Sequence, residues 1–219
     1  MSEPTVYNIQ YPFSGGNSNG QETFPGQPWD ALYSDGSAPW DIGEPQPAIV
    51  RLASEGAFTG TVLDAGCGTG ENTLHLATLG LPVMGIDVAE TALAIAQAKA
   101  DERGVKAEFA ATDALQLELL GCKFDTVLDC GLFQALDVIE RSEYVESLAS
   151  VTAREAILYV LCFSDDATNA NRYSVNQDEL EAAFNASTGW TITAIEPDRF
   201  HIREHNSGAP AWLATIKRN

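Results

Sequence analysis

The segment VLDAGCGTG at positions 62–70 constrains the fold of this chain most, because three glycines follow directly on a short apolar run. Residues 61–65 are predicted to form a buried strand, and residues 71–79 carry apolar side chains at helical spacing. Glycines are needed where a strand turns into a helix beside a ligand, because a side chain would keep the ligand away from the backbone. The segment therefore predicts an α/β unit with a ligand site at the glycine turn.

Strand-like and helical segments alternate through the rest of the chain. The predicted strands are residues 61–65, 82–87, 105–111, 124–130, 156–163, 190–196 and 211–217, and the predicted helices are residues 71–79, 89–103, 140–152 and 176–186, the last capped by Asn176. This order predicts a doubly wound, mostly parallel sheet with helices on both faces. Because no helix separates the last two strands, the last strand should run antiparallel, at the edge of the sheet. Ligands bind at the carboxyl ends of such strands, here after residues 65, 87, 111, 130, 163 and 197.

The composition changes near residue 48, after a stretch rich in glycine, proline and aromatic residues. Seven of the 19 aromatic residues lie within the first 40 positions, at Tyr7, Tyr11, Phe13, Phe24, Trp29, Tyr33 and Trp40. Disordered segments are poor in aromatic residues, so this stretch is expected to pack against the rest of the protein. We predict a lid segment over residues 1–47 and a ligand-binding domain over residues 48–219. Tyr11, Phe13, Trp29 and, beyond the lid segment, Phe133 are the predicted substrate contacts.

Charge and cysteine usage restrict the partners and the compartment. The chain has 31 acidic against 12 basic residues and a net charge of −19, so neither nucleic acid nor an acidic membrane surface is an expected partner. No apolar run approaches the ~20 residues that span a bilayer, and residues 1–10 do not resemble a signal peptide. The four cysteines, Cys67, Cys122, Cys130 and Cys162, show no paired spacing, which predicts reduced thiols in a cytoplasmic protein.

The glycine turn differs from that of dinucleotide-binding proteins. Their G-x-G-x-x-G pattern requires a third glycine where this chain has Glu71, and a carboxylate in the first helical turn would repel a pyrophosphate. Asp64 adds a second negative charge beneath the turn. The turn therefore favours a ligand with positive charge, and a dinucleotide-dependent reductase is the weakest alternative.

With its apolar strand, acid and G-x-G-x-G, VLDAGCGTG resembles the first motif of the class I S-adenosylmethionine-dependent methyltransferases, which have a Rossmann-like fold. The resemblance implies that Gly66, Cys67 and Gly68 lie against the methionine part of the cofactor. It also implies that Asp87 binds the ribose and that Val88 contacts the adenine. The full set of implied cofactor contacts is Trp40, Asp64, Gly66, Cys67, Gly68, Gly70, Asp87, Val88, Thr112, Asp113, Ala114, Asp129 and Cys130.

Three further segments extend the resemblance to a smaller group within these methyltransferases. PWDIGEPQP at 39–47, GLF at 131–133 and LCFSD at 161–165 are similar to the heterocyclic toxin methyltransferases near the thiopurine-methyltransferase branch. That similarity implies O-methylation of a small flat heteroaromatic such as a hydroxyquinolone, with a role in detoxification. Alternatives are a thiol, halide or N-methyltransferase of the same fold, or a cofactor-binding module without transfer activity. Whether the chain is a monomer or a homodimer is left open.

The sequence does not single out a catalytic base. Methyl transfer mainly requires alignment and exclusion of water, and Asp137, Asp165, Asp166 and His201 are the acids and bases near strand ends. Residues 201–205 fit the zinc-protease pattern H-x-x-E-H, but that pattern requires a helix, and here a strand and a turn are predicted. No metal site is therefore expected.

Overall fold

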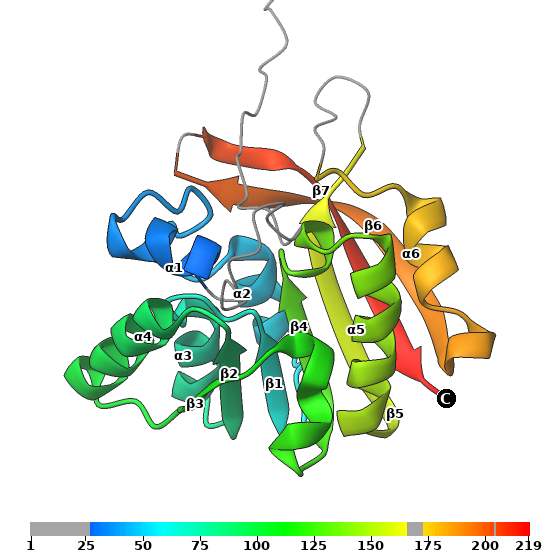
Figure 1. The fold of residues 1–219 in the computed structure, drawn as a ribbon, viewed down its shortest axis with the longest axis horizontal. Coiled ribbons are helices and arrows are strands. Elements are labelled where there is room, and N and C mark those ends of the chain that lie inside the picture. The colour runs from blue at the N-terminus through cyan, green and yellow to red at the C-terminus, as the bar shows by residue number, and fades with distance from the viewer. Residues whose placement is uncertain (1–26, 166–172, 204) are drawn as a thin grey trace, which may run out of the picture.

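The computed structural model describes residues 27–165, 173–203 and 205–219, which form an α/β fold around one seven-stranded sheet (Figure 1). The strands lie in the order β3-β2-β1-β4-β5-β7-β6. Their bounds are β1 (Val62–Ala65), β2 (Val83–Asp87), β3 (Glu108–Ala111), β4 (Phe124–Cys130), β5 (Thr152–Phe163), β6 (Trp190–Ile202) and β7 (His205–Arg218). The five strands β1 to β5 are parallel, which confirms the predicted sheet.

The reversed strand lies inside the sheet and not at its edge, contrary to our expectation. β7 pairs antiparallel with β5 on one side and with β6 on the other, so β6 is the edge strand. β6 also continues beyond its predicted end, and its carboxyl end is therefore at Ile202 instead of near Pro197. An edge strand tolerates a proline, because one side of its backbone has no partner strand.

Helices cover both faces of the sheet. Their bounds are α1 (Gln27–Ser34), α2 (Pro47–Ser54), α3 (Glu71–Thr78), α4 (Glu90–Arg103), α5 (Val138–Val151) and α6 (Gln177–Ala183), with 3₁₀ helices η1 (Ala114–Leu120), η2 (Phe133–Ala135) and η3 (Ala186–Thr188). One apolar core contains residues of α2 and α3, and a second contains residues of η1, α5 and α6. The predicted cap of the last helix is confirmed, because the Asn176 side chain accepts from the Glu179 amide at 2.8 Å.

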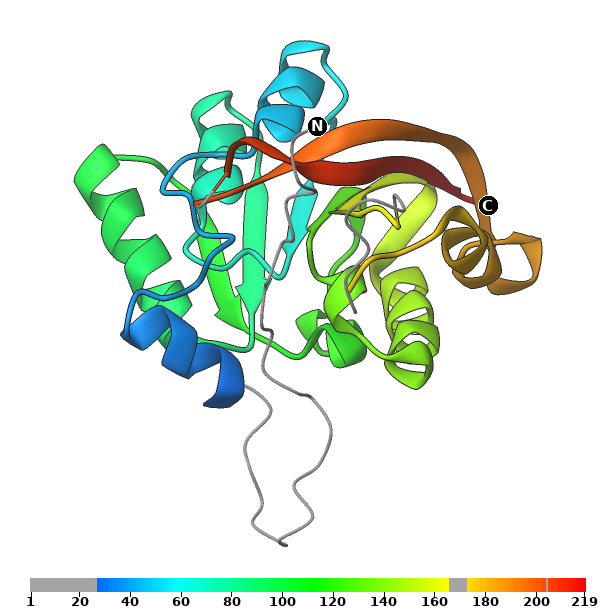
Figure 2. The same cartoon turned by 90° about the horizontal axis from the view of Figure 1, so that it is seen from above.

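The described part of the lid segment, residues 27–47, is held against two distant elements. Helix α1 lies beside α4 (Figures 1 and 2), where the Asp30 carboxylate accepts from the Thr91 amide at 2.7 Å. Farther along, the Pro39 carbonyl accepts from the Arg203 amide at the end of β6 at 2.9 Å. These contacts place the residues between α1 and α2 across the carboxyl ends of the strands.

Candidate active site

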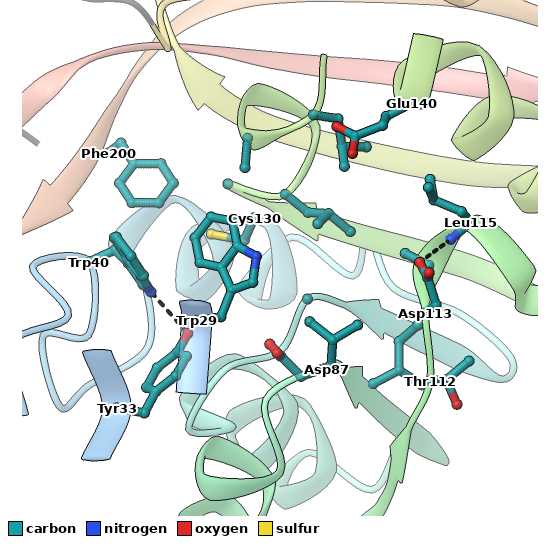
Figure 3. A pocket seen from close by; sticks show the side chains of 18 residues that line it. Trp29, Tyr33, Trp40, Asp87, Thr112, Asp113, Leu115, Cys130, Glu140 and Phe200 are labelled. Carbon is teal, nitrogen blue, oxygen red and sulfur yellow. Dashed lines mark hydrogen bonds between the residues drawn. The ribbon is translucent and has the colours of Figure 1, made fainter. Parts of the chain in front are cut away.

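A cleft opens where β1, β2, β3 and β4 end, at the predicted positions after residues 65, 87, 111 and 130 (Figure 3). Its empty volume is about 980 Å³, a figure that includes space open to solvent at its mouth. The lining residues are Trp29, Tyr33, Trp40, Gly66, Ile86, Asp87, Val88, Thr112, Asp113, Ala114, Leu115, Cys130, Gly131, Leu132, Ala135, Leu136, Glu140 and Phe200. An adjoining pocket extends over the glycine turn and is lined by Cys67 and Gly68 among others. The fold thus joins most of the predicted cofactor contacts in one place.

The glycine turn places backbone without side chains beside the cleft. Gly66 and Gly68 have φ angles of +72° and +53°, which side chains disfavour. A Cβ atom on Gly68 would lie 2.8 Å from the hydroxyl oxygen of Tyr33, a residue that lines both cavities. The turn therefore has no room for a side chain beside the Tyr33 hydroxyl, and the glycine backbone lines the adjoining pocket.

Asp87 connects the end of β2 with the glycine turn. Its carboxylate accepts from the Gly68 amide and from the Ala89 amide, each at 2.9 Å, and it lines the cleft. Burial raises the pKa of Asp87, and the two amide hydrogen bonds oppose that rise. The remaining lone pairs of this carboxylate are positioned to accept from ligand hydroxyls.

The other end of the cleft is formed by the segment after β3. Thr112, Asp113, Ala114 and Leu115 all line it, and the Asp113 side chain caps η1 by accepting from the Leu115 amide at 2.9 Å. The cap fixes the Asp113 carboxylate at the cleft wall.

Gly70, Asp64 and Asp129 lie outside the two cavities. A Cβ atom on Gly70 would lie 2.8 Å from that of Ala96, so this glycine lets α4 pack closely. Asp64 is buried and accepts from the Thr73 hydroxyl at 2.6 Å. Asp129 is fully buried and accepts from the Leu132 and Phe133 amides at 3.0 and 3.1 Å. Both acids support the loops that line the site.

The two buried acids predict an unusual pH dependence of stability. Burial raises the pKa of Asp64 and of Asp129 from 3.8 to about 7. Between these values the folded state binds more protons than the unfolded state, so their contribution to stability is lost as the pH rises toward 7. We expect Asp129→Asn to flatten the decline of the melting temperature between pH 4 and 8. The exposed Glu143→Gln is the control, and an unchanged slope in Asp129→Asn would contradict the burial argument.

Glu71 does not present a free charge to the ligand, which corrects the electrostatic argument from the sequence. Its carboxylate forms ion pairs with Lys99 at 2.9 Å and Arg103 at 2.7 Å, both on α4. Burial alone would raise the pKa of Glu71, but the hydrogen bonds from Arg103 and Lys99 hold it below its usual range. Lys99 also donates to the Thr69 hydroxyl at 2.7 Å, so this cluster fastens the glycine turn to α4.

We therefore expect Glu71→Gln to lower the free energy of unfolding by about 1–2 kcal/mol, because it leaves Lys99 partly buried without its carboxylate. Urea unfolding at pH 7 measures the loss, with the exposed Glu118→Gln as the control. The difference should shrink in acid, as the pH falls through the lowered pKa of Glu71 and the wild-type carboxyl also becomes neutral. Equal stability of the two variants at pH 7 would contradict a structural role of the ion pairs.

Aromatic side chains form much of the remaining wall. Trp40 packs edge to face against Trp29 at 5.8 Å between ring centroids, and its indole nitrogen donates to the Tyr33 hydroxyl at 2.9 Å. Phe200 of β6 completes the group, supported by Phe163 at 4.8 Å. Tyr33 and Phe200 were not predicted as site residues. The aromatic clustering before residue 48 was a usable signal for Tyr33, whereas the sequence offered none for Phe200.

Several predicted substrate and catalytic residues lie elsewhere. Phe133 is fully buried in the core against Phe184 and does not line either cavity, so its prediction as a substrate contact is wrong. Asp137 caps α5 by accepting from the Ile139 amide at 2.8 Å. Asp165 is exposed just beyond β5, and the His201 side chain lies outside the cleft. Tyr11, Phe13 and Asp166 lie outside the described residues.

Two kinds of feature are absent from the described residues. No group of three or more His, Cys, Asp or Glu side chains in the described ranges could hold a metal ion. Within those same ranges no helix is long and apolar enough to cross a membrane.

Comparison with known proteins defines the class. Residues 62–155 match the methyltransferase domain family. Over 167 residues the chain is 35% identical to the 2-heptyl-1-hydroxyquinolin-4(1H)-one methyltransferase of Mycobacteroides abscessus, covering 74% of this chain and 73% of that protein. A solved structure described for the conversion of a disulfide bond into a thioacetal group during echinomycin biosynthesis is 34% identical, with a TM-score of 0.80, covering 89% of this chain and 93% of that one.

A third likeness concerns the fold. The 1,6-didemethyltoxoflavin-N1-methyltransferase of Burkholderia thailandensis, solved with S-adenosylhomocysteine, has a TM-score of 0.72 over the whole length of both chains at 18% identity. Together with the glycine turn, these matches show that the chain belongs to the class I S-adenosylmethionine-dependent methyltransferases. It is an enzyme that methylates small molecules, and its cofactor is S-adenosylmethionine.

The residues present fit this cofactor. Gly66 and Gly68 line the adjoining pocket without a side chain, and the Asp87 carboxylate beside them suits a pair of ribose hydroxyls. When bound, S-adenosylmethionine supplies a methyl group activated by its sulfonium charge. The described residues of the cleft would bind and orient the reactants and keep water out.

Proposed function

We propose that the protein transfers a methyl group from S-adenosylmethionine to a hydroxyl oxygen of a small flat heteroaromatic, such as a hydroxyquinolone. The observation that carries the proposal is the aromatic wall formed by Trp29, Trp40 and Phe200 within the cofactor cleft. Rings of this kind bury a flat ligand at roughly 25 cal/mol per Å² and add about 0.5–1.5 kcal/mol for each stacked pair. The similarity to a hydroxyquinolone methyltransferase supports the same acceptor class.

The two ends of the cleft suggest where the cofactor and where the methyl acceptor bind. In Figure 3, Phe200 and Trp40 lie at one end, Thr112 and Asp113 lie at the other, and Asp87 lies between them. Adenosine at the Asp113 end, with its ribose on Asp87, leaves the aromatic end for the acceptor. Gly66 and the adjoining pocket then take the methionine part.

The lid segment belongs to this proposal. Its described part brings Trp29, Tyr33 and Trp40 onto the cleft, so residues 27–47 would cover the acceptor and exclude water during transfer. Alignment of the two reactants is the main contribution expected of the protein, because the thioether leaves without an acid. Methylation of a toxic hydroxyl compound in this way would serve detoxification.

A sulfur acceptor is the second candidate. It is favoured by the 34% identity to a protein described for the conversion of a disulfide bond into a thioacetal group. Both candidates use the same cofactor site and differ in the atom that receives the methyl group.

The experiment that separates them is a panel of hydroxyquinolones, phenols, aromatic amines, thiols and halides incubated with the enzyme and S-adenosylmethionine. Release of S-adenosylhomocysteine ranks the acceptors, and mass spectrometry with NMR locates the new methyl group. O-methylated hydroxyquinolone as the best product supports the proposal, whereas a thiol ranked first supports the second candidate. Binding of the cofactor without any methylated product would indicate a binding module.

A further inference from the structure

The candidate active site is lined by acids and by no base among the residues that the structure describes. Asp87, Asp113 and Glu140 line the cleft, and Asp41, Glu44 and Glu71 line the adjoining pocket. The partners that the Asp87 and Asp113 carboxylates bind within the protein are backbone amides, which carry no net charge.

Each nearby basic side chain pairs with an acid, and three of the four pair with Glu71 or Asp41 of the adjoining pocket. Lys99 and Arg103 pair with Glu71, Arg203 approaches Asp41 at 3.6 Å, and Arg141 pairs with Glu179 at 2.8 Å. None of these four basic residues lines the cleft or the adjoining pocket. Outside the described residues, the sequence has no Lys, Arg or His at positions 1–26 and one basic residue, Arg172, at positions 166–172, and the chain as a whole has a net charge of −19.

We infer that the site selects acceptors that bind without negative charge and rejects anionic ones, including halides, thiocyanate and aromatic carboxylates. This inference rests on the proposed function and narrows its acceptor class. An anion entering the cleft would lose water without meeting a basic side chain of the described residues, and the fixed carboxylates would repel it. Like-charge repulsion of this kind discriminates between ligands of the same shape.

The chemistry remains balanced with a neutral acceptor. A lone pair of the hydroxyl oxygen forms the new bond to the methyl carbon, and the carbon–sulfur bond breaks with its electron pair left on sulfur. The hydroxyl proton passes to water.

The test uses two acceptors of nearly equal shape, 4-hydroxyquinoline-2-carboxamide and 4-hydroxyquinoline-2-carboxylate. Calorimetry on the full chain saturated with S-adenosylhomocysteine measures binding without transfer, and turnover with S-adenosylmethionine gives kcat/KM. We expect the carboxamide to bind at least thirtyfold more tightly, with a similar ratio in kcat/KM. Iodide and thiocyanate should give no methylated product.

A parallel pair, 4-aminoquinoline-2-carboxamide and its carboxylate, keeps the two proposals separable. Equal binding of amide and carboxylate in the methylated series would overturn the charge inference and leave O-methylation standing. Methylation of the amine pair alone, with the amide preferred, would overturn the proposed function and support the charge inference. Iodide or thiocyanate as the best acceptor would overturn both.

A matched pair of variants tests where the selectivity arises. Leu136 lines the cleft, so Leu136→Lys adds one positive charge there. Leu136→Met introduces an unbranched side chain like that of lysine but without the charge. Leu136→Lys should reduce the preference for the carboxamide at least tenfold, and Leu136→Met should leave it unchanged. Melting curves verify that both variants fold. An unchanged preference in a folded Leu136→Lys enzyme would contradict electrostatic selection in the cleft.

Discussion

Asp87→Ala is expected to weaken binding of S-adenosylhomocysteine about a hundredfold while the protein remains folded. The proposed ribose site loses two hydrogen bonds to a charged acceptor, each worth about 1.5 kcal/mol or more, and about 3 kcal/mol corresponds to roughly a hundredfold in affinity. The Gly68 amide also loses its acceptor, which adds to the effect. Calorimetry measures the dissociation constant, and Asp87→Asn should fall between the wild type and the alanine variant.

A modified ligand separates ribose binding from support of the glycine turn. The 2′-deoxy analogue of S-adenosylhomocysteine should bind the wild type more weakly than the parent compound does. In Asp87→Ala the two ligands should bind alike, because their common partner is gone. If the affinity lost in Asp87→Ala and the affinity lost with the 2′-deoxy analogue add up, the ribose does not contact Asp87.

Gly68→Val should abolish cofactor binding. The backbone there has a φ of +53°, and even the first atom of a side chain would lie 2.8 Å from the Tyr33 hydroxyl oxygen. A β-branched side chain adds two methyl groups beyond that atom, so the turn or Tyr33, which lines both cavities, would have to shift. Calorimetry with S-adenosylhomocysteine should show no measurable binding.

Gly80→Val is the matched control for backbone strain. Gly80 has a φ of +86°, but an added Cβ would meet nothing within 4 Å. Both variants should therefore lose some stability, while Gly80→Val retains cofactor affinity. Gly68→Ala combined with Tyr33→Phe should recover part of the binding lost in Gly68→Ala alone, because the nearest ring atom is then 3.5 Å away. If folded Gly68→Val bound S-adenosylhomocysteine normally, the turn would have only a structural role.

Much of this site could be predicted because its signal is local in the sequence. The glycines of the turn and the acid ending β2 follow from short motifs, and the fold joins them as expected. The role of Asp137 was also accessible, because Asp137 and Glu140 have the spacing of a capping box at the start of α5. We assigned Asp137 instead to the candidate bases because it follows a strand end.

Other features depend on contacts between distant segments. The partners of Glu71 are on α4, and Phe200 reaches the cleft only because β6 extends to Ile202. Phe133 follows β4 directly, where an apolar side chain can face either the cleft or the core, and the space beside Phe184 decides for the core. The spacing of residues along the sequence does not indicate which of these distant contacts form.

The interior position of β7 has a consequence for protein synthesis. Among the described strands β6 is hydrogen-bonded to β7 alone, so it cannot join this sheet until residues 205–218 have left the ribosome. Until then β5 presents an open edge, which can pair wrongly with another chain. Phe200 is carried on β6, so the residues of the glycine turn leave the ribosome well before Phe200 can join the wall of the cleft. The wall of the cleft is therefore completed only when the last strand of the chain has been made.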